Sequence, residues 1–173
     1  MPDRRIRFCV RLLVMVGAMI AVGPLCPPAT RGDETLARRT AEARALSDQG
    51  AGAFKDGKLA ESIEYYTRAL AIYRDLGLRA DEAASIAAIG DIHAHMFNYE
   101  AAIPKYEEAV RLYRGLDAEV SLARVMLALG RAQMMLGRRE TAIGHFEDAL
   151  RVFRSVGDQA RAEEAQALIN RLR

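Results

Sequence analysis

The chain has 173 residues, of which 51% are hydrophobic and 28% charged, with 25 Lys and Arg against 23 Asp and Glu. This composition excludes a disordered tail and a multi-pass membrane protein, and the length suits one domain with a short leader. Residues 1–29 carry a net charge of +3 and leave −1 for the rest of the chain, so the body gives no electrostatic reason to expect a nucleic-acid partner.

Residues 1–29 have the pattern of a secretory signal peptide. A basic start is followed by an uncharged apolar run over residues 12–22 and then by Pro24, Pro27 and Pro28. This run is shorter than the span of about 20 residues that a membrane helix needs, and the prolines interrupt its extension. We therefore expect export to the periplasm or secretion. The alternative is an inner-membrane anchor over residues 12–22 that is not cleaved.

An internal repeat of 40 residues organises the rest of the chain. Glycines, aromatic residues and alanines recur at this interval in three successive units. The aligned positions are Gly50, Gly90 and Gly130; Tyr66, Tyr106 and Phe146; Ala69, Ala109 and Ala149; and Tyr73, Tyr113 and Phe153.

Each unit has the pattern of a helix, a tight turn and a second helix. Apolar residues recur at helical spacing on both sides of Gly57 and Gly137, and Phe97 occupies the same place in the second unit. The glycines inside the first helices cost about 1 kcal/mol each relative to alanine. We expect close packing of the aromatic residues from the second helices to offset that cost.

The junctions between units carry signals for the ends of helices. Gly77 and Gly157 are placed to end second helices, and Asp117 to cap the helix that follows it. We predict an extension of the first helix over 30–42, three repeats over about 43–77, 78–117 and 118–157, and a capping helix over 158–173. A cap with a polar outer side would cover the last exposed face of the stack.

This pattern resembles the tetratricopeptide repeat family. The resemblance rests on the glycine, aromatic and alanine positions above, the turn glycines, and Ser62, Ala102 and Ala142. It covers about residues 43–157, although the period of 40 exceeds the usual length of about 34. The resemblance implies an all-α fold, a right-handed α-solenoid in which the first helices line a concave groove.

The family's groove positions fall on residues from each of the three first helices. The candidates are Arg44, Phe54, Asp91, His95, Arg124, Arg131, Met134 and Met135. Their modest positive charge and adaptable methionines favour a peptide or helix segment with apolar and acidic residues. An alternative for Met134 and Met135 is that they belong to the core under the capping helix. The groove that grips a terminal carboxylate in one group of the family is not matched, because Ser47, Ala51 and Ala88 stand at its positions.

The sequence contains no motif for catalysis or for a cofactor. The body has no cysteine, no nucleophile elbow and no phosphate-binding loop. Asp91 with His95, and His145 with Asp148, are spaced to share a helix face, but ion pairs or hydrogen bonds explain such spacing better than a metal.

We therefore predict an exported adaptor or assembly factor that binds a protein partner, uses no cofactor and is a monomer. A structural protein that associates with itself is the first alternative. A metal-assisted enzyme is a distant second alternative.

Overall fold

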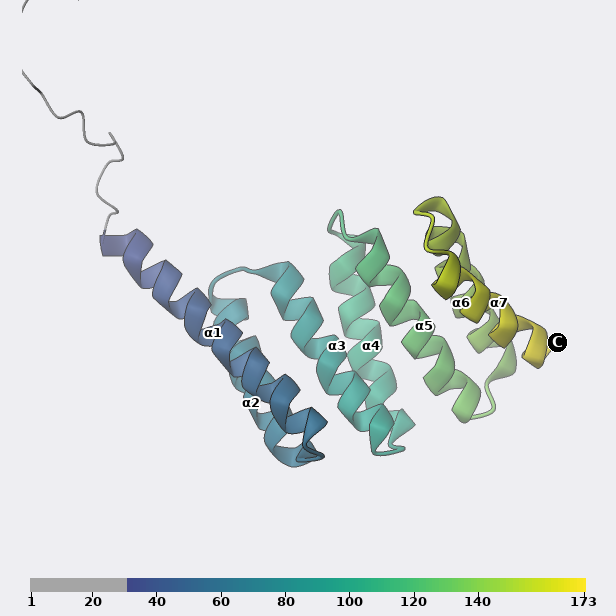
Figure 1. Ribbon diagram of the computed structural model, residues 1–173, viewed down its shortest axis with the longest axis horizontal. Helices are drawn as coiled ribbons and strands as arrows, with labels where there is room; N and C mark the ends of the chain where they lie inside the picture. The colour runs from purple at the N-terminus through teal and green to yellow at the C-terminus, as the bar shows by residue number, and fades with distance from the viewer. Residues whose placement is uncertain (1–30) are drawn as a thin grey trace, which may run out of the picture. The chain divides into compact units, whose positions relative to one another are not determined.

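The computed structural model describes residues 31–173, so the predicted leader over residues 1–29 lies outside the described part. This part consists of seven helices connected by short turns, and it contains no strand (Figure 1). None of its helices is both long and apolar enough to cross a membrane. The helices are α1 (Arg31–Lys55), α2 (Leu59–Asp75), α3 (Arg79–His95), α4 (Tyr99–Arg114), α5 (Glu119–Met135), α6 (Arg139–Ser155) and α7 (Gln159–Leu172).

The helices form three antiparallel pairs and a final single helix. The two helices of each pair pack on each other, α3 and α5 also pack on the second helix of the preceding pair, and α7 packs on α6 (Figure 1). A continuous core of buried aliphatic, aromatic and alanine side chains runs from α2 to α7. The predicted all-α solenoid of three helix pairs with a capping helix is confirmed.

Close contact between glycine and an aromatic ring holds each pair together, as the sequence predicts. A Cβ atom built on Gly130 would lie 2.6 Å from the ring of Phe146, and the corresponding distances are 2.8 Å for Gly90 and Tyr106 and 2.9 Å for Gly50 and Tyr66. Such separations are well inside van der Waals contact, so only glycine lets the rings sit where they do.

The turns inside the three pairs share one backbone geometry. Gly57 and Gly137 have φ values of 75° and 74°, and Phe97 adopts the same left-handed region with φ 58°. In each turn this residue donates a backbone hydrogen bond to the carbonyl three residues earlier, at 3.0 Å. The side chain of Phe97 is 77% exposed, so no burial compensates for its left-handed backbone.

The turns between pairs differ from one another. Gly77 and Gly157 have positive φ, as their predicted role at helix ends requires. The predicted N-cap role of Asp117 is wrong, because Ala118 occupies the N-cap of α5 and no side chain bonds to the helix start there. Helix α4 already ends at Arg114, and Gly115 and Leu116 bond back to it, which displaces Asp117 from the cap.

Both ends of the stack replace core residues by polar ones. Ile89, Leu129 and Ile169 are buried at equivalent positions, whereas Gln49 of α1 is exposed. In α7, Asn170 stands where the other units have their packed glycine, and it is also exposed. Polar end units are what a short solenoid needs to stay soluble.

Candidate functional site

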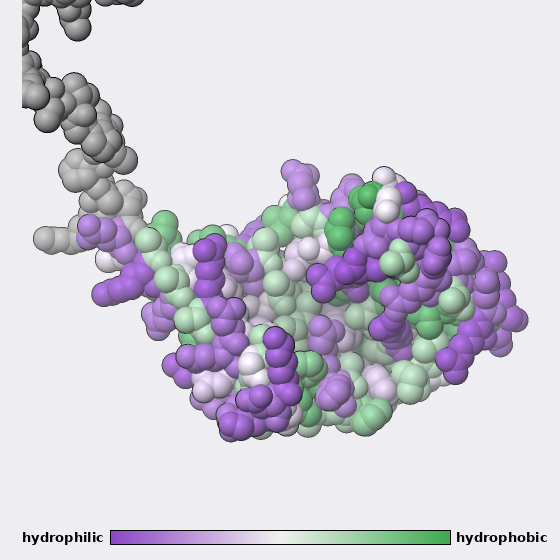
Figure 2. Space-filling model, in the orientation of Figure 1, coloured by the Kyte–Doolittle hydropathy of each residue, from purple (hydrophilic) through white to green (hydrophobic). Residues whose placement is uncertain are grey.

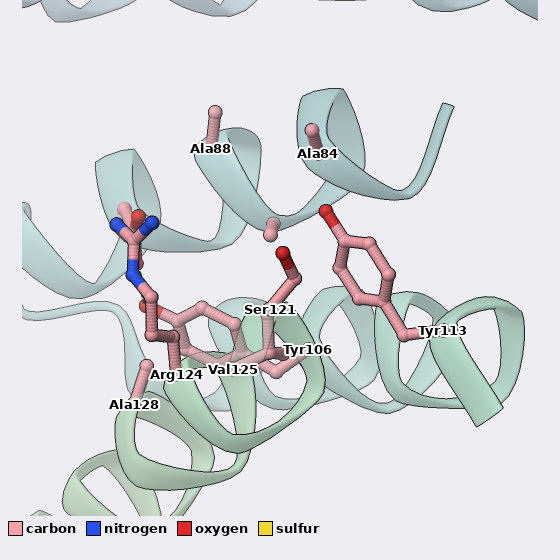
Figure 3. A pocket seen from close by; sticks show the side chains of 10 residues that line it. Ala84, Ala88, Tyr106, Tyr113, Ser121, Arg124, Val125 and Ala128 are labelled. Carbon is pink, nitrogen blue, oxygen red and sulfur yellow. Dashed lines mark hydrogen bonds between the residues drawn. The ribbon is translucent and has the colours of Figure 1, made fainter. Parts of the chain in front are cut away.

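A pocket of about 350 Å³ opens between α3 and α5, on the concave side of the stack, the face that Figure 2 shows hollowed in its middle. Helices α3 and α5 form its walls and α4 forms its floor (Figure 3). Small side chains from the two walls leave the space open, and they include Ala84, Ala87, Ala88 and Ala128. Five polar residues reach it, namely Asp91, Tyr106, Tyr113, Ser121 and Arg124.

Asp91 is the acidic group of this pocket. The Tyr106 hydroxyl donates a hydrogen bond of 2.7 Å to Asp91 Oδ1. Surrounding protein raises the pKa of the Asp91 carboxyl above its usual 3.8, although the bond from Tyr106 and the charges of Arg124 and Arg131 act in the opposite direction. The residue still touches solvent on the open side of the groove. Its carboxylate is therefore partly desolvated and remains accessible to a ligand.

Tyr113 and Ser121 form the opposite end of the pocket. Their hydroxyls lie near each other and both point toward the α3 wall (Figure 3). Burial raises the pKa of Tyr113 above its usual 10.0, while Arg124 and the hydrogen bond with Ser121 lower it. This end offers neutral hydroxyl groups, so the charge of the pocket is concentrated near Asp91 and Arg124.

The two predicted groove arginines of α5 differ in their partners. Arg131 forms an ion pair with Glu164 of α7, which engages its guanidinium, although its positive charge still acts on Asp91. Arg124 lines the pocket and makes no ion pair within residues 31–173. Arg124 is therefore the arginine whose guanidinium is available to a bound segment.

Phe54 and His95 form one rim of the concave side. Their rings make an edge-to-face contact with centroids 5.2 Å apart, which joins the ends of α1 and α3. His95 thus contacts an aromatic ring, and Asp91 accepts from Tyr106, so neither residue engages the other. Across the described helices, no group of three His, Cys, Asp or Glu side chains is arranged to hold a metal ion.

The remaining sequence candidates lie outside the pocket. Arg44 lines a shallow hollow of α1 together with Leu36 and Asp48. Met134 packs against the core, whereas Met135 is 54% exposed. The core interpretation therefore fits Met134, and a groove role of Met135 stays a prediction.

The sequence did not identify the two tyrosine hydroxyls of the pocket. The repeat pattern gives Tyr106 the role of a ring that fills space between helices, and it marks Tyr113 only as a repeat position. The first unit also has tyrosines here, Tyr66 and Tyr73, whereas the third unit has Phe146 and Phe153, so the hydroxyl groups distinguish the first two units from the third. That contrast was the available signal, because a buried tyrosine needs a partner for its hydroxyl and phenylalanine does not.

Comparison with known proteins agrees with the architecture. The sequence profile of the tetratricopeptide repeat matches residues 41–115 and, shifted by one unit, residues 81–155. No curated protein sequence matches the chain. The comparisons identify no catalytic family.

Solved structures with the same fold are distant in sequence. The apo form of RapI superposes with a TM-score of 0.73 at 15% identity, over 78% of this chain and 37% of RapI. The first TPR of Spaghetti (RPAP3), bound to the HSP90 peptide SRMEEVD, gives 0.61 at 20% identity over 77% of this chain and 91% of that domain. A Rap protein complexed with Competence and Sporulation Factor gives 0.67 at 19% identity, over 77% of this chain and 37% of that protein. This chain therefore spans only about a third of the two larger proteins.

Proposed function

Because the chain belongs to the tetratricopeptide repeat family, we propose that it binds a segment of a partner protein in the concave groove between α3 and α5. The observation that carries the proposal is the pocket itself. It combines an alanine-rich wall with an accessible carboxylate, an unpaired guanidinium and two hydroxyls. Apolar space with a few converging polar groups is the usual composition of a binding site.

Two structural neighbours support a peptide or protein ligand. The RPAP3 domain is bound to an HSP90 peptide, and a Rap protein is complexed with Competence and Sporulation Factor. Their identities to this chain are 20% and 19%, so they suggest the class of ligand and not its sequence.

The chemistry of the partner follows from the side chains that line the groove. Alanine and valine side chains in the pocket favour apolar residues of the partner. The basic character of the groove is reduced but not lost, because Arg131 is shared with Glu164 while its charge still acts on Asp91. The attraction of an acidic partner therefore rests mainly on Arg124, and this attraction is reduced by Asp91 in the same pocket.

The proposed location of the protein in the cell rests on the predicted leader. An exported chain with a protein-binding groove would serve as an adaptor or assembly factor in the cell envelope. The leader pattern over residues 1–29 supports this location. A self-associating structural role is the alternative, but the polar side chains at both ends of the stack disfavour repeated stacking of copies.

A pull-down from envelope extracts tests the proposal. Tagged full-length protein is compared with an Arg124→Glu variant and with Arg111→Glu, a control at an exposed position on α4 outside the pocket. We expect a partner that is captured by the wild type and by Arg111→Glu and is lost with Arg124→Glu, while all three have the same melting temperature. Equal capture by all three would place binding elsewhere, and recovery of the protein alone would favour self-association.

A further inference from the structure

One end of the α3–α5 pocket contains a carboxylate and a guanidinium that lie near each other but form no ion pair. Asp91 Oδ1 accepts from the Tyr106 hydroxyl, and within residues 31–173 the carboxylate has no other hydrogen-bond donor. The Arg124 guanidinium faces the same pocket, close enough to lower the pKa of Asp91, yet the two groups form no ion pair. Both groups keep hydrogen-bonding capacity for a ligand.

The position of Asp91 is held by neighbouring groups. Tyr106 rises from the floor helix and fixes one carboxylate oxygen at 2.7 Å. Arg131, which could otherwise turn to the carboxylate, is engaged with Glu164 of α7. The acceptor is therefore held in place before a ligand arrives, which reduces the ordering cost of binding.

We propose that this end of the pocket binds an amide group of the partner segment, with its oxygen toward Arg124 and its N–H toward Asp91. The proposal rests on the groove function above and specifies the chemistry that the groove recognises. An amide is neutral and has both a donor and an acceptor, so it uses both protein groups at once. A carboxylate ligand would be attracted by Arg124 and repelled by Asp91, and an ammonium ligand would meet the opposite pair of effects.

The walls of the pocket fit this ligand. Ala84, Ala88 and Ala128 leave about 350 Å³ free beside the charged end. That space admits either an extended peptide backbone or the side chain of glutamine or asparagine. The amide group is the chemistry that the two sources share, and small probes can separate them.

The test is an NMR titration of isotope-labelled full-length protein at neutral pH with four small probes. Butyramide, butyrate and butylammonium share one carbon chain and differ in charge, and N-methylacetamide represents a backbone amide. We expect saturable shifts at Asp91, Ser121 and Arg124 with butyramide or N-methylacetamide. Butyrate and butylammonium should bind more weakly, with dissociation constants about tenfold higher, because each charged probe is repelled by one of the two groups. Stronger binding of N-methylacetamide would indicate a backbone ligand, and stronger binding of butyramide a side-chain ligand.

Two substitutions that remove one charge each should change the order of the probes. Asp91→Asn removes the negative charge and retains an oxygen that can accept from Tyr106, so butyrate should become the preferred probe. Arg124→Gln removes the positive charge and should make butylammonium preferred. A side chain with only a structural role would leave the order of the probes unchanged.

Three results would overturn the proposal. Wild-type preference for butyrate would mean that Arg124 dominates and that the partner is acidic. Preference for butylammonium would mean that Asp91 dominates and that the partner is basic. Absence of saturable shifts at these residues with all four probes would mean that no amide site exists. Each result could occur while the pull-down still shows capture dependent on Arg124, so failure of this inference is separable from failure of the groove function.

Discussion

Glycine recurs in two regions of this molecule for two different physical reasons. Inside the helix pairs, Gly50, Gly90 and Gly130 lie against aromatic rings that leave no room for a Cβ atom. In the turns at the edge of the stack, Gly57 and Gly137 have open space around them and are needed only for a positive φ. Close packing against a ring is met by glycine in all three pairs. The positive φ of the turn, by contrast, is adopted by Phe97 in the middle pair.

The difference shows which constraint the fold can relax. A ring against a backbone cannot move without losing its burial, so the packed glycine is fixed wherever a second helix follows. Within residues 31–173 no second helix packs on α7, and Asn170 stands at the same repeat position. A left-handed turn costs a residue other than glycine about 1–2 kcal/mol, which a stable domain can tolerate.

Removal of a packed ring should have the largest effect. Phe146 is fully buried, so Phe146→Ala should lower the free energy of unfolding by about 3–5 kcal/mol through lost burial and a residual cavity. Urea denaturation followed by circular dichroism measures the change. A loss below about 1 kcal/mol would contradict the role of the ring between the helices.

Addition of a methyl group at the packed glycine should have the next largest effect. In Gly130→Ala the new Cβ atom would lie 2.6 Å from the Phe146 ring. We expect the strain to exceed the gain in helix propensity and to lower stability by about 1–3 kcal/mol. Gly144→Ala on α6 is the matched control, since nothing lies within 4 Å of its added Cβ atom. That control should raise stability, and equal effects of both substitutions would refute the steric argument.

Replacement of the strained turn residue should stabilise the protein. Phe97→Gly removes a left-handed phenylalanine whose side chain is 77% exposed. We expect a gain of about 0.5–1 kcal/mol, because the relief of strain exceeds the added freedom of the unfolded chain. The reverse change, Gly137→Phe, should destabilise by a similar amount in the same denaturation assay. A loss of stability in Phe97→Gly would show that the edge-to-face contact between the Phe97 and Tyr99 rings outweighs the backbone strain.

Glycine at Asp117 should have the smallest effect and the opposite sign. Asp117 stands where the other junctions have Gly77 and Gly157, but its backbone is not left-handed. Asp117→Gly therefore relieves no strain and should lower stability by about 0.5 kcal/mol through entropy of the unfolded chain. A gain like that of Phe97→Gly would mean that this turn also stores strain.

The sequence predicted the elements whose causes are local or periodic. The repeat of 40 residues located the helix pairs, and glycine opposite an aromatic residue predicted their packing. The turn before α5 was mispredicted because the choice between an aspartate cap and an early helix end depends on how α4 and α5 pack. No pattern within one turn contains that information.

The candidate site was predicted in part. The repeat positions of Asp91 and Arg124 placed both in the groove, and the structure brings them into one pocket. The pairing of Arg131 with Glu164 could not be predicted, since it depends on where α7 lies against α5. Charges on repeated helices become informative only when the partner from the next unit is known.

Site-specific photo-crosslinking tests the central claim, binding in the concave groove, most directly. A photoreactive phenylalanine analogue is placed at Ala88, which lines the pocket, or at Gly144, which lies on α6 outside it. We expect the partner found in the pull-down to crosslink to position 88 and not to position 144. A crosslink from position 144 alone would contradict binding in the groove and place the binding surface on the second helices.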